Sequence, residues 1–322
     1  MNGETVLVTG GLGCIGVPTV NWLLRETECK IVVGSRKVTE SSLARFGSHP
    51  DRLFAAALDV QKSSDVERVF ATYPINRIAH LSGLQTPDCN EHRDLGLQVN
   101  LAGTQHLIEA AKRSSETISR FIYASSIAVY GPRTHYPEGL VPMNAEPLPV
   151  NVYGVWKLAS EHITRIFSEE TGIPSLSIRP GVLFGPGRDV GLTSTVTTAM
   201  KMAAANQPYQ IPFSNRQDYL FASDVGAAFG NALIEPFEGY GAVTLPSHTV
   251  TSERIAATIR EQAKSLGLEG ADGILIGDQE VPFICDVDFA PFMQLFPKTP
   301  HTPLSEAVRQ SLIYFRDNPA AN

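Results

Sequence analysis

The sequence predicts an α/β fold, a doubly wound parallel sheet with a small C-terminal lobe. Two observations predict it. Short apolar runs rich in β-branched residues alternate with segments of helical period, which is typical of βαβ units. After Pro180 the pattern changes to glycine-rich loops, short helices and proline-rich connections. We expect the body at residues 1–180 plus about 215–245, and the lobe at 181–214 and 246–322.

Each element of the body is expected from its apolar pattern and its flanking turn residues. The expected strands are Thr5–Thr9, Lys30–Ser35, Leu53–Ala57, Arg77–Leu81, Arg120–Ala124 and Pro174–Ile178. Helices are expected at about 14–26, 63–72, 92–113 and 151–171. Farther along, Phe221–Ile234 is expected to run from a strand into a core helix, so this later segment is expected to belong to the body as well.

Composition excludes several classes of function. The net charge is −7, and the 26 lysines and arginines are scattered, which disfavours a nucleic-acid partner. We expect neither a signal segment at the N-terminus nor a membrane span, because apolar runs of about 18 residues are missing. The histidines show no metal-binding spacing. Four widely separated cysteines disfavour zinc and disulfides and favour a cytoplasmic location: Cys14, Cys29, Cys89 and Cys285.

The first expected strand runs directly into a glycine-rich turn that opens a helix. Gly10, Gly13 and Gly16 have the spacing that lets a backbone turn tightly and approach a pyrophosphate at a helix N-terminus. This context indicates a dinucleotide site of the Rossmann type; a purely structural glycine turn is the alternative. The candidate cofactor-binding residues here are Gly10, Gly13, Cys14, Ile15 and Gly16.

The end of the second expected strand bears on the choice of cofactor. An NAD enzyme usually presents Asp or Glu to the ribose hydroxyls there, whereas this chain has Ser35, Arg36 and Lys37. A guanidinium can bind a 2′-phosphate through two hydrogen bonds, so NADP is favoured over NAD. The alternative is that both cations are solvated loop residues.

A tyrosine and a lysine stand four residues apart at the start of an expected helix. Tyr153 and Lys157 therefore share a face, and the ammonium is expected to stabilise phenolate and lower the pKa of the tyrosine toward neutrality. Such a tyrosine serves as a general acid or base. Ser125 and Ser126 follow the strand Arg120–Ala124, where a hydroxyl faces the ligand crevice of a parallel sheet. Each motif alone is more often structural.

Taken in order, these motifs resemble the extended short-chain dehydrogenase/reductase family, also called the NAD-dependent epimerase/dehydratase family. The resemblance covers nearly the whole chain: Thr9–Gly16, Asp59–Val60, His80–Gly83, Asn100–Thr104, Ser125–Gly131, Tyr153–Lys157, Arg179–Pro180 and Tyr219–Val225. It implies catalysis by Ser126, Tyr153 and Lys157, with Lys157 also binding the nicotinamide ribose. The further cofactor residues that it implies are Asp59 and Val60 beside the adenine, Leu81, Ser82 and Gly83 along the dinucleotide, and Asn100.

The resemblance also bears on the substrate. Three positions at which family members hold or approach a nucleotide diphosphate depart here, namely Gln217, Leu275 and Val182. A diphosphate without arginines would be poorly neutralised, so a smaller polar substrate is expected. Thr193 and Ser194, together with Ser125 and Ser126, are the candidate substrate-binding residues; the alternative for Thr193 is a helix cap. The sequence Ile127–Val129 replaces the acidic pair of the family's 4,6-dehydratases, which disfavours dehydration.

The leading hypothesis is an NAD(P)-dependent oxidoreductase that interconverts a secondary alcohol and a ketone on a sugar, sugar acid or related small polar substrate. The alternative enzyme is a sugar or nucleotide-sugar epimerase with tightly bound NAD, and a non-catalytic redox sensor is the alternative of another class. The resemblance further implies a homodimer through the helices near 92–113 and 151–171. Apolar residues there fit a helical contact, although some must face the sheet: Leu95, Val99, Leu107 and Trp156.

Overall fold

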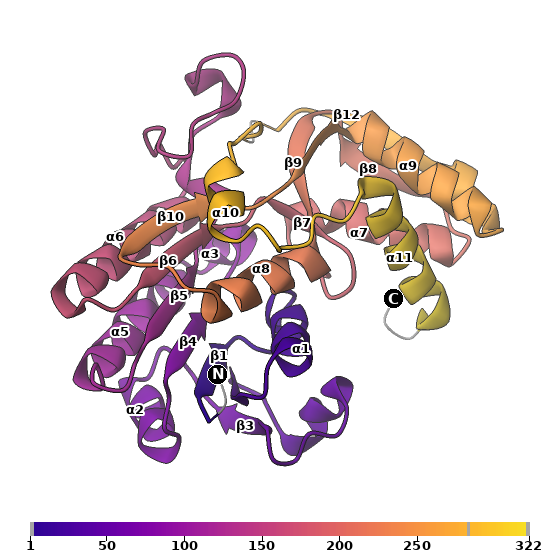
Figure 1. The fold of residues 1–322 in the computed structure, drawn as a ribbon. Coiled ribbons are helices and arrows are strands. Elements are labelled where there is room, and N and C mark those ends of the chain that lie inside the picture. Colours follow the sequence, from indigo (N-terminus) through magenta and orange to yellow (C-terminus); the bar gives the residue numbers. More distant parts are fainter. Residues whose placement is uncertain (1–2, 282–283, 320–322) are drawn as a thin grey trace.

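The computed structural model describes residues 3–281 and 284–319 (Figure 1). Its centre is a parallel sheet of seven strands in the order β10-β6-β5-β4-β1-β2-β3. The strands are β1 (Thr5–Thr9), β2 (Lys30–Ser35), β3 (Leu53–Ala57), β4 (Arg77–His80), β5 (Arg120–Ala124), β6 (Ser175–Arg179) and β10 (Tyr240–Thr244). This doubly wound order, which reverses between β1 and β4, confirms the predicted Rossmann-type α/β fold.

Helices cover both faces of this sheet, and the alternation of side chains along each strand explains why. Val6 and Val8 of β1 face one layer, whereas Leu7 faces the other. The first layer holds α1 (Gly16–Glu26), α8 (Ala222–Ile234) and α10 (Ala290–Leu295). The second holds α2 (Ser63–Thr72), α5 (Gly103–Arg113) and α6 (Val152–Thr171).

The expected helix at 92–113 is divided. It consists of α4 (Arg93–Leu97), a π-helical turn (Gln98–Ala102) and α5, and an unpredicted helix, α3 (Thr86–Glu91), precedes it. Such π-turns are frequent at functional sites because they redirect one side chain of a helix. Here the turn carries Asn100, which is buried.

A second hydrophobic cluster forms the lobe beside the sheet (Figure 1). Its strands are β7 (Val182–Phe184), β8 (Tyr209–Phe213), β9 (Arg216–Phe221), β11 (His248–Thr251) and β12 (Ile274–Gln279). Its helices are α7 (Thr195–Ala204), α9 (Ser252–Ser265) and α11 (Leu304–Asp317). Strand β9 pairs with β7 and β11 and leads into α8, so the chain returns from the lobe to the face of the central sheet.

A small cluster joins the lobe to the segment between β5 and α6. Val129, Tyr130 and Val141 pack against Ile284 and Val287, and Val141 and Val287 form an isolated parallel bridge.

Among the described residues, no helix is long and apolar enough to cross a membrane.

Candidate active site

A pocket of about 530 Å³ lies at the carboxyl ends of the central strands, between the sheet and the lobe. Ligands of doubly wound sheets bind at this edge, and the volume is in the usual range for small-molecule sites. Its wall is formed by residues that follow β1, β4, β5 and β6, by the start of α6, and by Arg188, Thr193 and Ile284 from later segments.

The glycine turn after β1 forms one wall. Gly10 has a φ of +66°, and a Cβ atom placed on Gly16 would lie 2.3 Å from the Gly10 carbonyl oxygen. Neither position tolerates a side chain without a shift of the backbone. Helix α1 begins at Gly16 without a side-chain cap, and Cys14, Ile15 and Gly16 line the pocket, so the positive end of the helix dipole is at the wall. A bare backbone and a helix N-terminus fit a dinucleotide pyrophosphate.

The loop after β4 forms the adjoining wall, and a buried network shapes it. The Thr9 hydroxyl accepts hydrogen bonds from the amides of Leu81 and Ser82, both at 3.2 Å. His80 lies between Thr9 and Thr104 with ring-nitrogen to hydroxyl distances of 2.8 and 3.1 Å, and its burial lowers its pKa to about 3. His80 is therefore a neutral core residue. Leu81 lines the pocket, whereas the described lining does not include Ser82.

Asn100 supports the same loop from below. Its side chain binds both the amide and the carbonyl of Leu84, at 3.0 and 3.2 Å. A Cβ atom on Gly83 would lie 2.9 Å from Asn100 Oδ1 and 3.3 Å from Lys157 Nζ. Gly83 lines the pocket and Asn100 does not, so in this structure Asn100 shapes the wall without being part of it.

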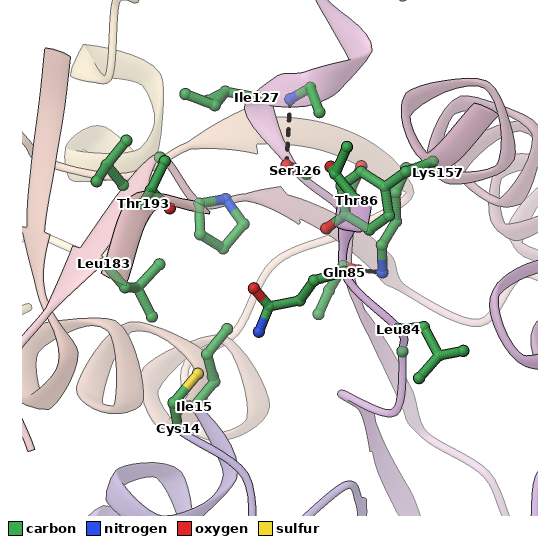
Figure 2. Close-up of a pocket in the computed structure, with 18 of the residues that line it drawn as sticks. Cys14, Ile15, Leu84, Gln85, Thr86, Ser126, Ile127, Lys157, Leu183 and Thr193 are labelled. Atoms are coloured by element: carbon green, nitrogen blue, oxygen red, sulfur yellow. Dashed lines mark hydrogen bonds between the residues drawn. The ribbon is translucent and has the colours of Figure 1, made fainter. Parts of the chain in front are cut away.

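The pocket brings together the three residues predicted to carry the chemistry, of which Figure 2 labels Ser126 and Lys157. Tyr153 and Lys157 lie one turn apart on α6, which Asn151 caps by accepting a hydrogen bond from the Gly154 amide at 2.9 Å. Lys157 Nζ donates to the Ala124 carbonyl at 2.7 Å and lies 5.6 Å from the centroid of the Tyr153 ring. Ser126 starts a 3₁₀ turn and accepts a hydrogen bond from the Ala128 amide at 3.1 Å.

The expected fall in the pKa of Tyr153 toward neutrality is wrong for this structure. Desolvation raises the pKa of Tyr153 to about 12, although a hydrogen bond with Ser126 and the charge of Arg188 oppose the rise. Desolvation also lowers the pKa of Lys157 to about 8. The ammonium bonds a carbonyl rather than the phenol, and near neutral pH the phenol stays protonated whereas Lys157 stays charged at a cost in free energy.

The neighbouring Ser125 belongs to a buried network. Its hydroxyl donates to Glu161 Oε1 at 2.5 Å, and Glu161 forms a two-point ion pair with Arg179, with nitrogen–oxygen distances of 2.8 and 2.6 Å. Arg179 also donates to the Tyr130 hydroxyl at 2.7 Å. Ser125 lines the pocket, but its hydroxyl already donates its hydrogen bond to the Glu161 carboxylate. Ser126 is therefore the hydroxyl that can still donate to a ligand.

Sequence reasoning missed several polar residues of the pocket, among them Arg188 and Gln85. Arg188 donates to Gln85 Oε1 at 2.7 Å and to the Thr193 hydroxyl at 2.9 Å, and Gln85 points into the centre of the pocket (Figure 2). Arg188 follows Gly-Pro-Gly in a loop, a pattern that gives no functional signal. Thr193 lines the pocket through this contact and does not cap α7, whereas Ser194 donates to the Gly191 carbonyl and stays outside the described lining.

Five predicted cofactor residues lie at the same edge of the sheet but outside the described lining of the pocket, namely Ser35, Arg36, Lys37, Asp59 and Val60. Arg36 and Lys37 are exposed in a turn at the end of β2. The Asp59 carboxylate accepts two hydrogen bonds from Gln61, and Val60 is buried against Gly103. They follow β2 and β3, the strands beyond β1 in the sheet.

None of the three positions at which this chain departs from the family's nucleotide-diphosphate site supplies a cation. Gln217 is buried and bonds Asn215 at 3.0 Å, and Leu275 is 58% exposed on β12. Val182 lines the pocket as an apolar wall. Residues 3–281 and 284–319 contain no cluster of three or more His, Cys, Asp or Glu that could hold a metal ion.

Comparisons with known proteins show which family and fold the chain resembles. The model of the NAD dependent epimerase/dehydratase family matches residues 6–244. A dTDP-glucose 4,6-dehydratase of Neisseria meningitidis is 28% identical over 56% of this chain, and the match spans about half of that relative, 54%. Among solved structures, the UDP-glucose 4-epimerase of Thermus thermophilus in complex with NAD has a TM-score of 0.78 at 23% identity, covering 97% of this chain and 99% of that one. L-threonine dehydrogenase of Clostridium difficile has a TM-score of 0.81 at 19% identity, covering 99% of both chains.

The solved structures show the shared fold, and the family match covers well over half of the sequence. The predicted family, and with it the prediction of an enzyme, is confirmed. The chain belongs to the NAD-dependent epimerase/dehydratase family and is an enzyme of the extended short-chain dehydrogenase/reductase type.

Proposed function

We propose that this enzyme is an NAD(P)-dependent oxidoreductase that interconverts a secondary alcohol and a ketone on a small polar substrate. The observation that carries the proposal is that Ser126, Tyr153 and Lys157 line one pocket together with Gly10 and Gly16, which leave their backbone open to a pyrophosphate. The wall thus combines a proton-transfer group with a surface for a dinucleotide.

Each residue has a role in this proposal. A bound nicotinamide dinucleotide accepts or supplies the hydride. Tyr153 exchanges the proton of the reacting oxygen, and Ser126 donates a hydrogen bond to that oxygen. Lys157 binds the nicotinamide ribose and keeps a positive charge beside the phenol, which favours the ionised tyrosine. The alternative of a non-catalytic sensor would not require these three residues in one pocket.

For the cofactor, we propose NADP, with the dinucleotide extending from the pocket over the ends of β2 and β3. The exposed Arg36 and Lys37 lie there with Ser35, and the Asp59 carboxylate is engaged by Gln61. Titrating the protein with NADPH and NADH by fluorescence, for the wild type and for Arg36→Ala, tests this.

We expect NADPH to bind more tightly than NADH, and Arg36→Ala to weaken NADPH by about 10- to 100-fold, the effect of losing a charge-assisted bond to phosphate. Arg45→Ala, which removes another exposed arginine, should leave both affinities unchanged. A preference for NADH, or protein that is purified with NAD already bound, would contradict the NADP proposal.

The second candidate is a sugar epimerase with tightly bound NAD. It is supported by relatives such as the dTDP-L-rhamnose 4-epimerase of Burkholderia thailandensis, 24% identical over 78% of this chain. We rank it below the oxidoreductase because Gln217 and Leu275 leave a nucleotide diphosphate without arginines, and Arg216 pairs with Asp286 at 2.6 Å. Stoichiometric NAD released by denaturing the purified protein would place the epimerase first. Dehydration is disfavoured because the described pocket lining contains no Asp or Glu.

We further propose that the lobe binds the substrate; it was predicted at residues 181–214 and 246–322, and the structure adds β9 to it and packs α10 on the sheet instead. We also propose that two copies pair through α5 and α6 and the turns beside them. Leu97, Val155 and Ile166 are 37–48% exposed on this side, whereas Val99 and Leu107, suggested for the contact, are buried against the sheet. Light scattering after size-exclusion chromatography would test for the dimer. All four cysteines are free, which supports the cytoplasm, a location that fractionation of source cells would test.

A further inference from the structure

The pocket contains an arginine whose charge no described carboxylate neutralises. Arg188 forms hydrogen bonds to Gln85 and Thr193 and interacts with the Cys14 thiol, all neutral groups, and none of the ion pairs in the described chain includes it. By contrast, Arg179 below the floor of the pocket is fully paired with Glu161. Arg188 therefore keeps its full charge at the wall of the pocket.

The guanidinium also has donors to spare. An arginine carries five N–H groups; Gln85 and Thr193 accept one each and the Cys14 thiol interacts with the guanidinium as well, so donors remain for a ligand. The Nε atom is buried without a hydrogen-bond partner in the described structure. A buried N–H without an acceptor costs free energy that a bound oxyanion would recover.

The surroundings of Arg188 favour an anion as well. The thirty residues that line the pocket include two cations, Arg188 and Lys157, and no Asp or Glu. The protein as a whole has a net charge of −7, so this local excess of positive charge is specific to the pocket. Arg188 and Tyr153 both line this pocket, and the charge of Arg188 opposes the rise in the pKa of the phenol.

We propose that Arg188 binds a carboxylate of the substrate, so that the substrate is a hydroxy acid or the matching keto acid. This proposal rests on the proposed function and narrows its substrate class. The carboxylate takes the free guanidinium donors, while the carbon that bears the hydroxyl or ketone lies toward Tyr153 and Ser126.

A single guanidinium matches a carboxylate better than it matches the alternatives. A diphosphate carries more charge, and the described structure places no second arginine in the pocket for it. Arg188 also lies close to the glycine turn, because its charge and its hydrogen bond oppose the burial-driven rise in the pKa of Cys14 in that turn. The phosphates of the cofactor are therefore the other anion that Arg188 could bind. The experiment must therefore separate substrate from cofactor.

Calorimetric titration of the NADPH-saturated protein distinguishes the ligands. The probes are malonate, which has two carboxylates and no alcohol to oxidise, its neutral analogue malonamide, inorganic phosphate and UDP-glucose. The variants are Arg188→Gln, Arg188→Lys, and Arg216→Gln as the control for an arginine outside the pocket. NADPH affinity and the melting temperature are measured for each.

We expect malonate to bind and malonamide not to bind. Arg188→Gln should weaken malonate about tenfold or more while NADPH affinity stays within about threefold, because a lost charge-assisted bond affects only its own ligand. Arg188→Lys should bind malonate more weakly than wild type, because an ammonium lacks the planar fork. If Arg188→Gln folds poorly, Arg188→Lys carries the test, and Arg216→Gln should match wild type.

Three outcomes would overturn the proposal. If Arg188→Gln weakens NADPH and not malonate, the guanidinium serves the cofactor. If phosphate or UDP-glucose binds more tightly than malonate and depends on Arg188, the ligand is a phosphate. If malonate fails to bind to protein that binds NADPH, the carboxylate site is wrong while the proposed function survives. A wild-type protein that binds no dinucleotide would instead refute the proposed function.

Discussion

Replacing Lys157 with methionine should stabilise the empty enzyme near neutral pH, although it removes a residue proposed for catalysis. The lysine is 4% exposed, and burial lowers its pKa from 10.5 to about 8. The lower folded-state pKa means that the unfolded chain binds more protons, so the group destabilises the fold below pH 8 and does so less as the pH rises toward 10.5.

The magnitude follows from the two pKa values. At 1.36 kcal/mol per pKa unit, charging the buried lysine costs roughly 3 kcal/mol at pH 7 and less than about 1 kcal/mol at pH 10. Methionine removes this cost but also loses the bond from Nζ to the Ala124 carbonyl, worth about 1–2 kcal/mol at either pH. The net gain at pH 7 should be about 1–2 kcal/mol, and it should disappear or reverse at pH 10.

Urea unfolding of both proteins without cofactor, at pH 7 and pH 10, measures the effect. Because the lost hydrogen bond affects both measurements alike, the difference between the two pH values isolates the titration of Lys157. It should be about 2–3 kcal/mol. The exposed Lys62→Met variant controls for the loss of one positive charge. Equal effects of Lys157→Met at both pH values would show that the buried lysine is not under electrostatic strain.

Three further substitutions test other parts of the argument. Gly16→Ala puts a Cβ atom 2.3 Å from the Gly10 carbonyl oxygen, so NADPH affinity should fall at least about tenfold in a fluorescence titration, and wild-type affinity would show that the turn does not hold the cofactor. Glu161→Gln breaks the buried pair with Arg179 and should lower the free energy of unfolding by about 3–5 kcal/mol in urea; a loss below about 1 kcal/mol would contradict the assignment of this network to the core. His80 has a pKa of about 3 in the fold, so it contributes stability that is present above pH 6.5 and lost as the pH falls; His80→Asn should reduce the loss between pH 7 and pH 5 by about 2 kcal/mol, and an unchanged loss would mean that His80 accepts a proton without cost.

Much of the central sheet could be predicted because its strands are buried on both faces. Runs such as Thr5–Thr9 and Lys30–Ser35 are continuous, β-branched and bounded by turns, and their bounds agree with the structure. Strand β6 is shifted by one residue, to Ser175–Arg179, because the side chain of Arg179 finds a buried partner in Glu161 and allows the strand to continue. The short β10 carries no such pattern, and only its pairing with β6 makes it a strand.

The candidate site was predictable where local chemistry imposes a spacing. The glycine turn and the pair Tyr153 and Lys157 have fixed spacings in sequence, and these can be recognised without knowledge of the fold. Arg188 and Gln85 have no offset to read, because they meet across about a hundred residues of sequence. The role of Asn100 was equally hidden, since it depends on a π-turn that presents the side chain to the Leu84 backbone.

The pKa shifts of Tyr153 and Lys157 have one cause. Desolvation raises the pKa of Tyr153 to about 12 and lowers that of Lys157 to about 8, so near neutral pH the empty site holds a protonated phenol beside an ammonium that is charged at a cost. Arg188 adds a charge that the described residues leave unpaired. A bound anion would pair with Arg188 and, by its negative charge, raise the pKa of Lys157, which keeps the ammonium charged, and that of Tyr153, which keeps the phenol protonated. Filled in this way, the pocket would hold Tyr153 in the protonated form that reduction of a ketone requires.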